Sequence, residues 1–279
     1  MHITSDAGRA AWAAITTDPS TTLVCSDFDG VLSPIVDNPD EAWASEDTVG
    51  VLERLGSRVA KVAIVTGRPA RQAVRLGRLD ERTGLASASV LGLYGFERWD
   101  ADTGDYDEPE APGGVANAAA ALPDLLADHD LADARIENKR LSVGVHTREL
   151  PDPAAAFERL TGPLTELAES HDLQVEPGRF VLELRARGLD KGDAIRRLVD
   201  ELHPTAIIYA GDDLGDLPAF RAVRWLRESG RVKALLICSG SDEQDALVAV
   251  SDVVVDGPDG VAELLGELAD ALDAAHPGA

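Results

Sequence analysis

The chain has 279 residues, of which 44% are hydrophobic and 27% charged, and its formal charge is −24 at pH 7. This composition is typical of a globular protein with a sizeable core, and the length predicts one large or two ordinary domains. The 50 Asp and Glu residues outnumber the 26 Lys and Arg residues, which argues against nucleic acid or an anionic membrane as partner. The chain shows no apolar run of membrane-spanning length and no secretory signal pattern at its N-terminus, so we expect a cytoplasmic protein.

Short apolar runs alternate with longer helical patterns along most of the chain. The expected buried strands are bounded by Gly, Asp or Pro and cover residues 22–26, 62–65, 89–93, 206–210, 234–238 and 253–255. The helical patterns cover residues 46–55, 71–79, 191–201, 217–227, 244–249 and 260–274. This alternation predicts an α/β fold whose parallel sheet is covered on both faces and binds its ligand beyond the carboxyl ends of the strands. Cys25 and Cys238 lie in apolar runs and are expected to be buried, with neither a disulfide nor a zinc site.

The middle of the chain has a different pattern. Residues 100–114 are rich in Asp, Glu, Gly and Pro, as in a linker. After them we expect helices at 115–127 and 153–170 and strands at 135–148 and 174–185. We therefore expect an inserted α+β domain at 108–184, with residues 1–107 and 185–279 forming the core domain.

The first chemical motif is Asp27-Phe28-Asp29-Gly30, directly after an expected strand. Residues i and i+2 point to the same side of a strand, so Asp27 and Asp29 can converge while Gly30 lets the chain turn. Two convergent carboxylates can hold Mg²⁺, and one can act as a nucleophile that becomes an aspartyl-phosphate. The alternative is an Asp-rich turn without chemistry.

Three further motifs lie at strand ends or helix starts. Thr66 and the backbone N–H groups that follow it, at Gly67, can hold phosphate oxygens, although Thr-Gly is also a common strand exit. Lys191 lies at a helix N-terminus, where the helix dipole disfavours a cation, so it can serve an anion or simply be solvated. Asp212 is a candidate metal ligand, and Asp216 is a ligand, a supporting group or a helix cap. Together the motifs supply what phosphoryl transfer requires.

The order DxDG, TGR, DKG and GDDxxD resembles the haloacid dehalogenase superfamily of phosphatases. The segments DFDGVLSPIVDNPDEA, VAIVTGRP, GLYGFE, ENKRLSVGVHTRE, FVLELRARGLDKGDAI and IYAGDDLGDLPAF, in that order, are similar to the trehalose-6-phosphate phosphatase family. The resemblance covers about residues 22–257. It implies a Rossmann-like core with an inserted α/β cap of the C2 type, and a small-molecule sugar phosphate as the substrate. We expect a monomer rather than an oligomer.

The resemblance also implies residue roles. Asp27 attacks phosphorus, and Asp29 protonates the leaving oxygen and then activates water. The implied Mg²⁺ ligands are the Asp27 carboxylate, the Asp29 carbonyl and Asp212, with Asp216 nearby. The phosphate is assigned to Thr66, Gly67 and Lys191, and the sugar to Arg68, Glu137, Lys139, His146, Arg148 and Glu183.

Strand parity complicates the cap assignments. In one uninterrupted strand, Glu137 and Lys139 share one side while His146 and Arg148 share the other. All four can meet one ligand only if a turn or bulge interrupts the strand near residues 138–140. The region is locally basic, which suits an anionic substrate.

The chain departs from the family pattern at a few positions. Tyr94, Gly215, Leu217, Thr147 and Ala186 stand where His, Thr, Glu, an aromatic residue and Pro are usual. These changes leave open another sugar phosphate or glycosyl-polyol phosphate as the substrate. A further alternative is a non-catalytic sugar-phosphate-binding regulatory protein. A nicotinamide-binding fold is rejected, because this chain has no G-x-G-x-x-G motif after its first expected strand.

Overall fold

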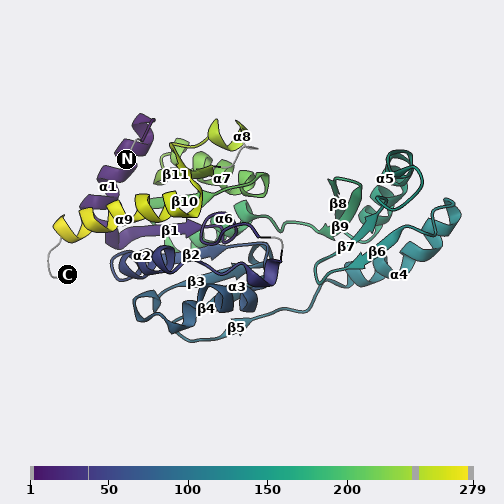
Figure 1. Cartoon of the computed structure of the whole chain (residues 1–279), viewed down its shortest axis with the longest axis horizontal. Coiled ribbons are helices and arrows are strands. Elements are labelled where there is room, and N and C mark those ends of the chain that lie inside the picture. The colour runs from purple at the N-terminus through teal and green to yellow at the C-terminus, as the bar shows by residue number, and fades with distance from the viewer. Residues whose placement is uncertain (1–2, 37, 241–244, 276–279) are drawn as a thin grey trace. The chain divides into compact units, whose positions relative to one another are not determined.

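The computed structural model describes residues 3–36, 38–240 and 245–275 (Figure 1). The chain forms two compact units, Met1–Glu108 with Leu189–Ala279, and Pro109–Gly188. The last strand of the second unit, β9 (Val181–Ala186), is paired along its whole length within that unit, where Arg185 lies opposite Ser142. The chain therefore leaves the second unit after β9 is complete.

The first unit is built on a largely parallel sheet. Within the described residues the sheet has eight strands in the order β12-β11-β10-β1-β2-β3-β4-β5. Its strands are β1 (Thr22–Ser26), β2 (Lys61–Val65), β3 (Ser89–Gly92), β4 (Glu97–Asp100), β5 (Tyr106–Asp107), β10 (Ala206–Gly211), β11 (Lys233–Gly240) and β12 (Val253–Asp256). Its α-helices are α1 (Asp6–Thr17), α2 (Glu46–Gly56), α3 (Ala70–Gly77), α6 (Lys191–Leu202), α7 (Leu217–Glu228), α8 (Asp245–Val248) and α9 (Gly257–Ala275).

The predicted parallel sheet is confirmed, and its centre is β1. This strand pairs in parallel with β10 on one side and β2 on the other, and all five of its residues are buried. The six expected core strands are all present, with ends that differ from the prediction by at most two residues. Gln244, the first residue of one expected helix, lies outside the described residues.

The edge strands β4 and β5 were not predicted. They run antiparallel, with Val90 of β3 opposite Trp99 of β4 and Trp99 opposite Tyr106 of β5. Residues 100–114, predicted as a linker, thus include a short strand. Its two residues give no alternation to detect, because the pattern needs about four residues.

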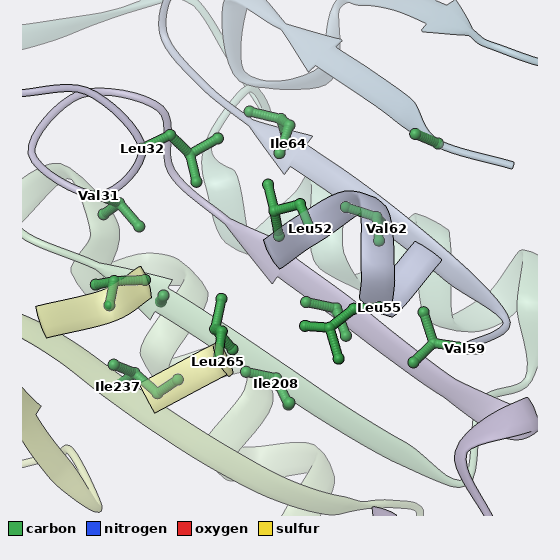
Figure 2. Close-up of a cluster of buried hydrophobic side chains, with 14 of the residues drawn as sticks. Val31, Leu32, Leu52, Leu55, Val59, Val62, Ile64, Ile208, Ile237 and Leu265 are labelled. Carbon is green, nitrogen blue, oxygen red and sulfur yellow. The ribbon is translucent and has the colours of Figure 1, made fainter. Parts of the chain in front are cut away.

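Two hydrophobic cores cover the two faces of this sheet. Successive residues of a strand face opposite sides, so Val24 lies in one core while Leu23 and Cys25 lie in the other. Figure 2 shows part of the first core, where Leu52 and Leu265 of α2 and α9 lie against residues of the sheet. The second core packs α6 and α7 on the opposite face. Both cysteines are buried and free, as predicted.

The N-terminal segment forms α1, which packs on the first core through Ala11 and Ile15. Ser5 caps this helix, since its hydroxyl accepts a hydrogen bond from Gly8 N–H at 2.8 Å. The same hydroxyl donates to the buried Asp252 carboxylate at 2.5 Å, and Asp252 also binds Arg227 at 2.7 Å. No helix among the described residues is long and apolar enough to cross a membrane.

The second unit is a four-stranded antiparallel sheet with two helices. The sheet order is β6-β7-β9-β8, with β6 (Arg135–Asn138), β7 (Ser142–His146) and β8 (Leu173–Gly178). The helices α4 (Gly113–Asp128) and α5 (Pro153–Ser170) pack on one face, against side chains such as Val143 and Leu184.

Both long strands predicted in this unit are in fact hairpins. The first turns at residues 139–141, where Lys139 N–H donates to the Ser142 carbonyl at 2.9 Å. The second turns at Arg179 and Phe180, and Phe180 takes a positive φ of 60°. A single strand was predicted because neither turn carries the Asn-Gly or Asp-Gly signal of a tight hairpin.

A cavity in the first core should cost this fold much of its stability. Leu52→Ala removes a fully buried side chain, and we expect a loss of about 2–5 kcal/mol in the free energy of unfolding. Urea unfolding monitored by circular dichroism measures it. Val254→Ala is the control, because Val254 is 48% exposed and should change stability by less than about 0.5 kcal/mol. Equal losses in the two variants would contradict this assignment of the core.

Candidate active site

The expected site residues of the first unit gather at the carboxyl edge of its sheet. Asp27, Thr66 and Asp212 follow β1, β2 and β10, which are adjacent strands. Lys191 is the first residue of α6. All four line one cavity of about 700 Å³, together with Asp29, Gly67 and Arg68 among others. This volume lies within the range of small-molecule sites.

The centre of the site is a buried ion-pair chain. Lys191 Nζ lies 2.6 Å from Asp27 Oδ2 and 2.7 Å from Asp216 Oδ1. The three side chains are at most 8% exposed. Burial acts to lower the pKa of Lys191, but the charges of Asp27 and Asp216 outweigh it and raise that pKa above its usual value. Lys191 is therefore a fixed cation, and the interpretation of a solvated surface lysine is wrong.

Asp216 lies at one end of this row of ion pairs and is fully buried, away from the cavity. Its Oδ1 also accepts a hydrogen bond from the Tyr209 hydroxyl at 2.6 Å. Its Oδ2 accepts from the backbone N–H groups of Asp212 at 2.9 Å and Asp213 at 3.3 Å. The side chain thus organises the loop after β10 and holds Lys191, which fits the supporting and capping roles considered for it.

Four carboxylates gather at this point. Oxygens of Asp27, Asp212, Asp213 and Asp216 all lie within 4.8 Å of one another. Burial raises the pKa of the Asp212 carboxyl to about 7, and the negative charges of Asp216 and Asp213 add to the rise. Burial likewise raises the pKa of Asp27 well above its usual range, and Lys191 opposes that rise. Hard oxygen donors with uncompensated negative charge fit a divalent cation such as Mg²⁺.

Gly30 allows Asp212 to approach the loop after β1. Its φ is +66°, and a Cβ at this position would lie 2.1 Å from Asp212 Oδ2. A side chain at position 30 would thus displace one member of the acidic cluster. The glycine of the DxDG motif is required by both backbone conformation and space.

Asp29 and Arg68 form a second ion pair at the cavity wall. Arg68 Nε donates to Asp29 Oδ2 at 2.7 Å, and Arg68 Nη2 donates to Oδ1 at 2.6 Å. Arg68 Nη1 also donates to the Pro39 carbonyl at 2.7 Å, and its guanidinium lies 5.6 Å from the Phe28 ring centre. This bidentate pair orients Asp29, whose side chain remains 37% exposed.

Thr66 lies at the start of the loop between β2 and α3. Its side chain is buried, and its hydroxyl accepts a hydrogen bond from Arg68 N–H at 3.2 Å. Glu97, also buried, accepts from Ala70 N–H at 2.7 Å and so satisfies the N-terminus of α3. The loop is held in place from both ends.

The sugar-binding residues expected in the second unit lie on and around its sheet. The turn at 139–141 reverses the parity, and Glu137 Oε2 lies 2.6 Å from His146 Nε2. Lys139 Nζ lies 3.1 Å from Glu183 Oε2, and Ser142 Oγ also donates to Glu183. Arg148 lies past the end of β7, where its guanidinium reaches the Arg179 carbonyl at 3.4 Å. The turn that parity required is thus present, whereas the sugar-binding roles stay predictions.

Sequence reasoning missed several residues of the first site. Asp213 was quoted within its motif, but no role was predicted for this member of the acidic cluster. Tyr209 was placed in a buried strand, and its hydroxyl bond to Asp216 was not expected. Tyr94 was noted only as a departure from a family pattern, yet it lines the cavity.

The fold and site define a class of protein. The structure superposes on a haloacid dehalogenase-like hydrolase from Bacteroides thetaiotaomicron, with a TM-score of 0.62, 15% identity and 88% and 99% of the two chains covered. It also superposes on an Aspergillus fumigatus trehalose-6-phosphate phosphatase, with a TM-score of 0.76, 21% identity and 97% and 100% covered. The chain therefore shares the fold of haloacid dehalogenase-like hydrolases. The family model of trehalose-phosphatases matches residues 25–253, and the chain belongs to that family.

Curated relatives are longer than this chain. It is 33% identical over 260 residues to a trehalose-phosphate phosphatase of Mycobacterium marinum, with 88% of this chain and 61% of the relative covered. Two Mycobacterium tuberculosis proteins named as uncharacterized glycosyl hydrolases match at 33% over 210 residues, which is 71% of this chain and 15% of their length.

The raised pKa of Asp212 should make the stability of the fold depend on pH. The folded-state pKa of Asp212, about 7, lies above the ordinary value of 3.8, so the folded state holds this proton between about pH 4 and pH 7 and loses stability as the pH rises through that range. At pH 8 in chelator, Asp212→Asn should therefore raise Tm by about 2–4 °C, or about 1 kcal/mol.

Mg²⁺ should raise the Tm of the unmodified protein and not that of the Asp212→Asn variant, because the variant lacks a ligand. Differential scanning fluorimetry with and without Mg²⁺ measures both effects. Asp133→Asn, an exposed position outside the cluster, is the matched control and should behave as the unmodified protein does. The same Mg²⁺ shift in Asp212→Asn would count against this metal site.

Proposed function

We propose that this protein is a Mg²⁺-dependent phosphatase that hydrolyses trehalose 6-phosphate to trehalose and phosphate. The observation that carries the proposal is the buried Asp27–Lys191 pair at the end of β1, 2.6 Å long and facing the cavity. A carboxylate beside a fixed cation is the pairing that phosphoryl transfer uses, and this supports Asp27 as the nucleophile. Membership of the trehalose-phosphatase family supports the substrate.

In the first step, an Asp27 carboxylate oxygen attacks phosphorus. The bond between phosphorus and the sugar oxygen breaks, and Asp29 gives that oxygen its proton, which yields free trehalose and an aspartyl-phosphate on Asp27. Both Asp29 carboxylate oxygens accept hydrogen bonds from Arg68, so the proposal requires one of them to exchange that contact for the leaving oxygen. Lys191 and the Thr66 hydroxyl, with the Gly67 N–H group, hold the phosphoryl oxygens.

In the second step, Asp29 takes a proton from a water molecule whose oxygen attacks phosphorus. The bond between phosphorus and Asp27 breaks, phosphate leaves and the Asp27 carboxylate is restored. Mg²⁺, when bound by Asp27, Asp212 and the Asp29 carbonyl with Asp216 in support, supplies charge neutralisation for the phosphoryl group.

The remaining assignments belong to the same proposal. We assign the sugar hydroxyls to Glu137, Lys139, His146, Arg148 and Glu183, and also to Arg68. Ion pairs among these residues, such as Lys139–Glu183 at 3.1 Å, keep their polar groups oriented. We further propose that the enzyme is cytoplasmic and monomeric, and that it binds neither nucleic acid nor a membrane.

Asp27→Asn should abolish turnover, because an amide is a poor nucleophile, while the similar volume leaves the fold intact. Phosphate release from a panel of sugar phosphates, with Mg²⁺ and with chelator, measures it, and Tm checks folding. We expect at least a 10³-fold loss in kcat, as is usual when a catalytic nucleophile is removed.

Preference for trehalose 6-phosphate in this panel would support the substrate. Turnover of other sugar phosphates with trehalose 6-phosphate poor would keep the reaction and overturn the substrate. Absence of Mg²⁺-dependent release from every substrate would leave a binding or regulatory protein.

Glu137→Ala should weaken hydrolysis of trehalose 6-phosphate far more than that of p-nitrophenyl phosphate, which carries no sugar. The lost carboxylate removes a charge-assisted hydrogen bond, so we expect a change of about tenfold or more in the ratio of the two kcat/KM values. Glu158→Ala, at an exposed position of α5, is the control. Equal losses on both substrates would show that Glu137 does not read the sugar.

A further inference from the structure

The turn after β3 has an unusual backbone. Leu93 and Tyr94 are successive residues with positive φ values, 47° and 61°, although neither is glycine. Residues that have a Cβ atom rarely adopt this left-handed backbone conformation, and where they do the surrounding structure must hold them there. Such residues gather at functional sites, because a local cost in conformational energy is retained only where it positions something useful.

The strained turn is tied to the loop that carries Thr66 and Arg68. Leu93 N–H donates to the Arg68 carbonyl at 2.9 Å, and Tyr94 N–H donates to the Thr66 carbonyl, also at 2.9 Å. A glycine at position 94 would make the same backbone hydrogen bond without strain. The backbone therefore does not explain the tyrosine, and its side chain is the feature to account for.

The Tyr94 phenol lies over Gly67. A Cβ at Gly67 would lie 2.9 Å from the Tyr94 hydroxyl oxygen and 3.0 Å from its Cζ atom, so the phenol would have to shift. The φ of Gly67 is outside the left-handed region, so the backbone does not require glycine here. Gly67 leaves room for the phenol, and both residues line the cavity that holds Asp27 and Lys191.

Tyr94 differs chemically from its neighbours in this cavity. Among the described residues that line it, Tyr94 is the only aromatic one, and the groups at the centre of the site are charged. Charged groups suit the phosphoryl group and a cation. A phenol instead offers an apolar ring and one hydroxyl that both donates and accepts, which suits the C–H faces and hydroxyls of a sugar.

We propose that Tyr94 is a specificity-determining residue that contacts the sugar next to the transferred phosphoryl group, from a position fixed by the strained turn and by the space at Gly67. This inference rests on the proposed function and extends it to a residue outside the charged centre. A hydroxyl placed to bond a substrate hydroxyl also discriminates against leaving groups that lack one.

The test compares kcat/KM for trehalose 6-phosphate and p-nitrophenyl phosphate in Tyr94→Phe and Tyr94→Ala. Loss of one neutral hydrogen bond should lower the ratio of the two values about fivefold in Tyr94→Phe, and loss of the ring should lower it further in Tyr94→Ala. Tyr106→Phe is the matched control: Tyr106 is half-buried, stacks on Arg71 at 4.0 Å, and is not among the residues lining this cavity. The control should leave the ratio unchanged.

Equal losses on both substrates in Tyr94→Phe, or an unchanged ratio, would overturn the role of Tyr94. A purely structural role would lower Tm without changing substrate preference, so Tm is measured for every variant. Calorimetric binding of trehalose 6-phosphate to Asp27→Asn, with and without Tyr94→Phe, gives a second readout that needs no turnover.

We expect the added Tyr94→Phe change to raise Kd about fivefold. If the unmodified protein binds trehalose 6-phosphate but does not hydrolyse it, the proposed function is overturned, and the Kd comparison still decides the role of Tyr94. No binding to trehalose 6-phosphate or to other sugar phosphates would overturn both.

Discussion

The structure depends on one buried cation among acids. Lys191 lies between Asp27 and Asp216 at 2.6 and 2.7 Å, and a lone carboxylate in that position would be costly to ionise. Its charge keeps the end of β1, the start of α6 and the loop after β10 together. The same balance leaves an excess of negative charge at Asp212 and Asp213, and this cluster of hard oxygen donors fits a divalent cation.

A parallel sheet makes this arrangement possible. The loops that follow parallel strands all lie at the same edge of the sheet, so residues far apart in the chain meet there. The tight loops depend on small residues, since Gly30 accommodates Asp212 and Gly67 accommodates Tyr94. A larger side chain at Gly30 would displace Asp212, and one at Gly67 would displace Tyr94.

The second unit carries a group of paired polar residues on its sheet. The helices α4 and α5 pack on one face of its sheet. Away from that apolar core, Glu137 pairs with His146 and Glu183 pairs with Lys139. The hairpin at residues 139–141 brings Glu137 and His146 together, because the two strands run in opposite directions from the turn. Mutual ion pairs hold these polar groups in place without a hydrophobic core around them.

The sequence by itself determined the six core strands and the positions of Asp27, Lys191 and Asp212 at the ends of strands or the start of a helix, because buried strands and the charged motifs beside them are local patterns. It did not determine the two hairpins or the edge strands β4 and β5, whose turns and short lengths carry weak local signals. Only the tertiary structure showed that Asp216 holds Lys191, that Arg68 holds Asp29, and that Tyr94 lies over Gly67. Those contacts join residues from different loops, and pairing across loops is decided by the packing of the sheet and its helices.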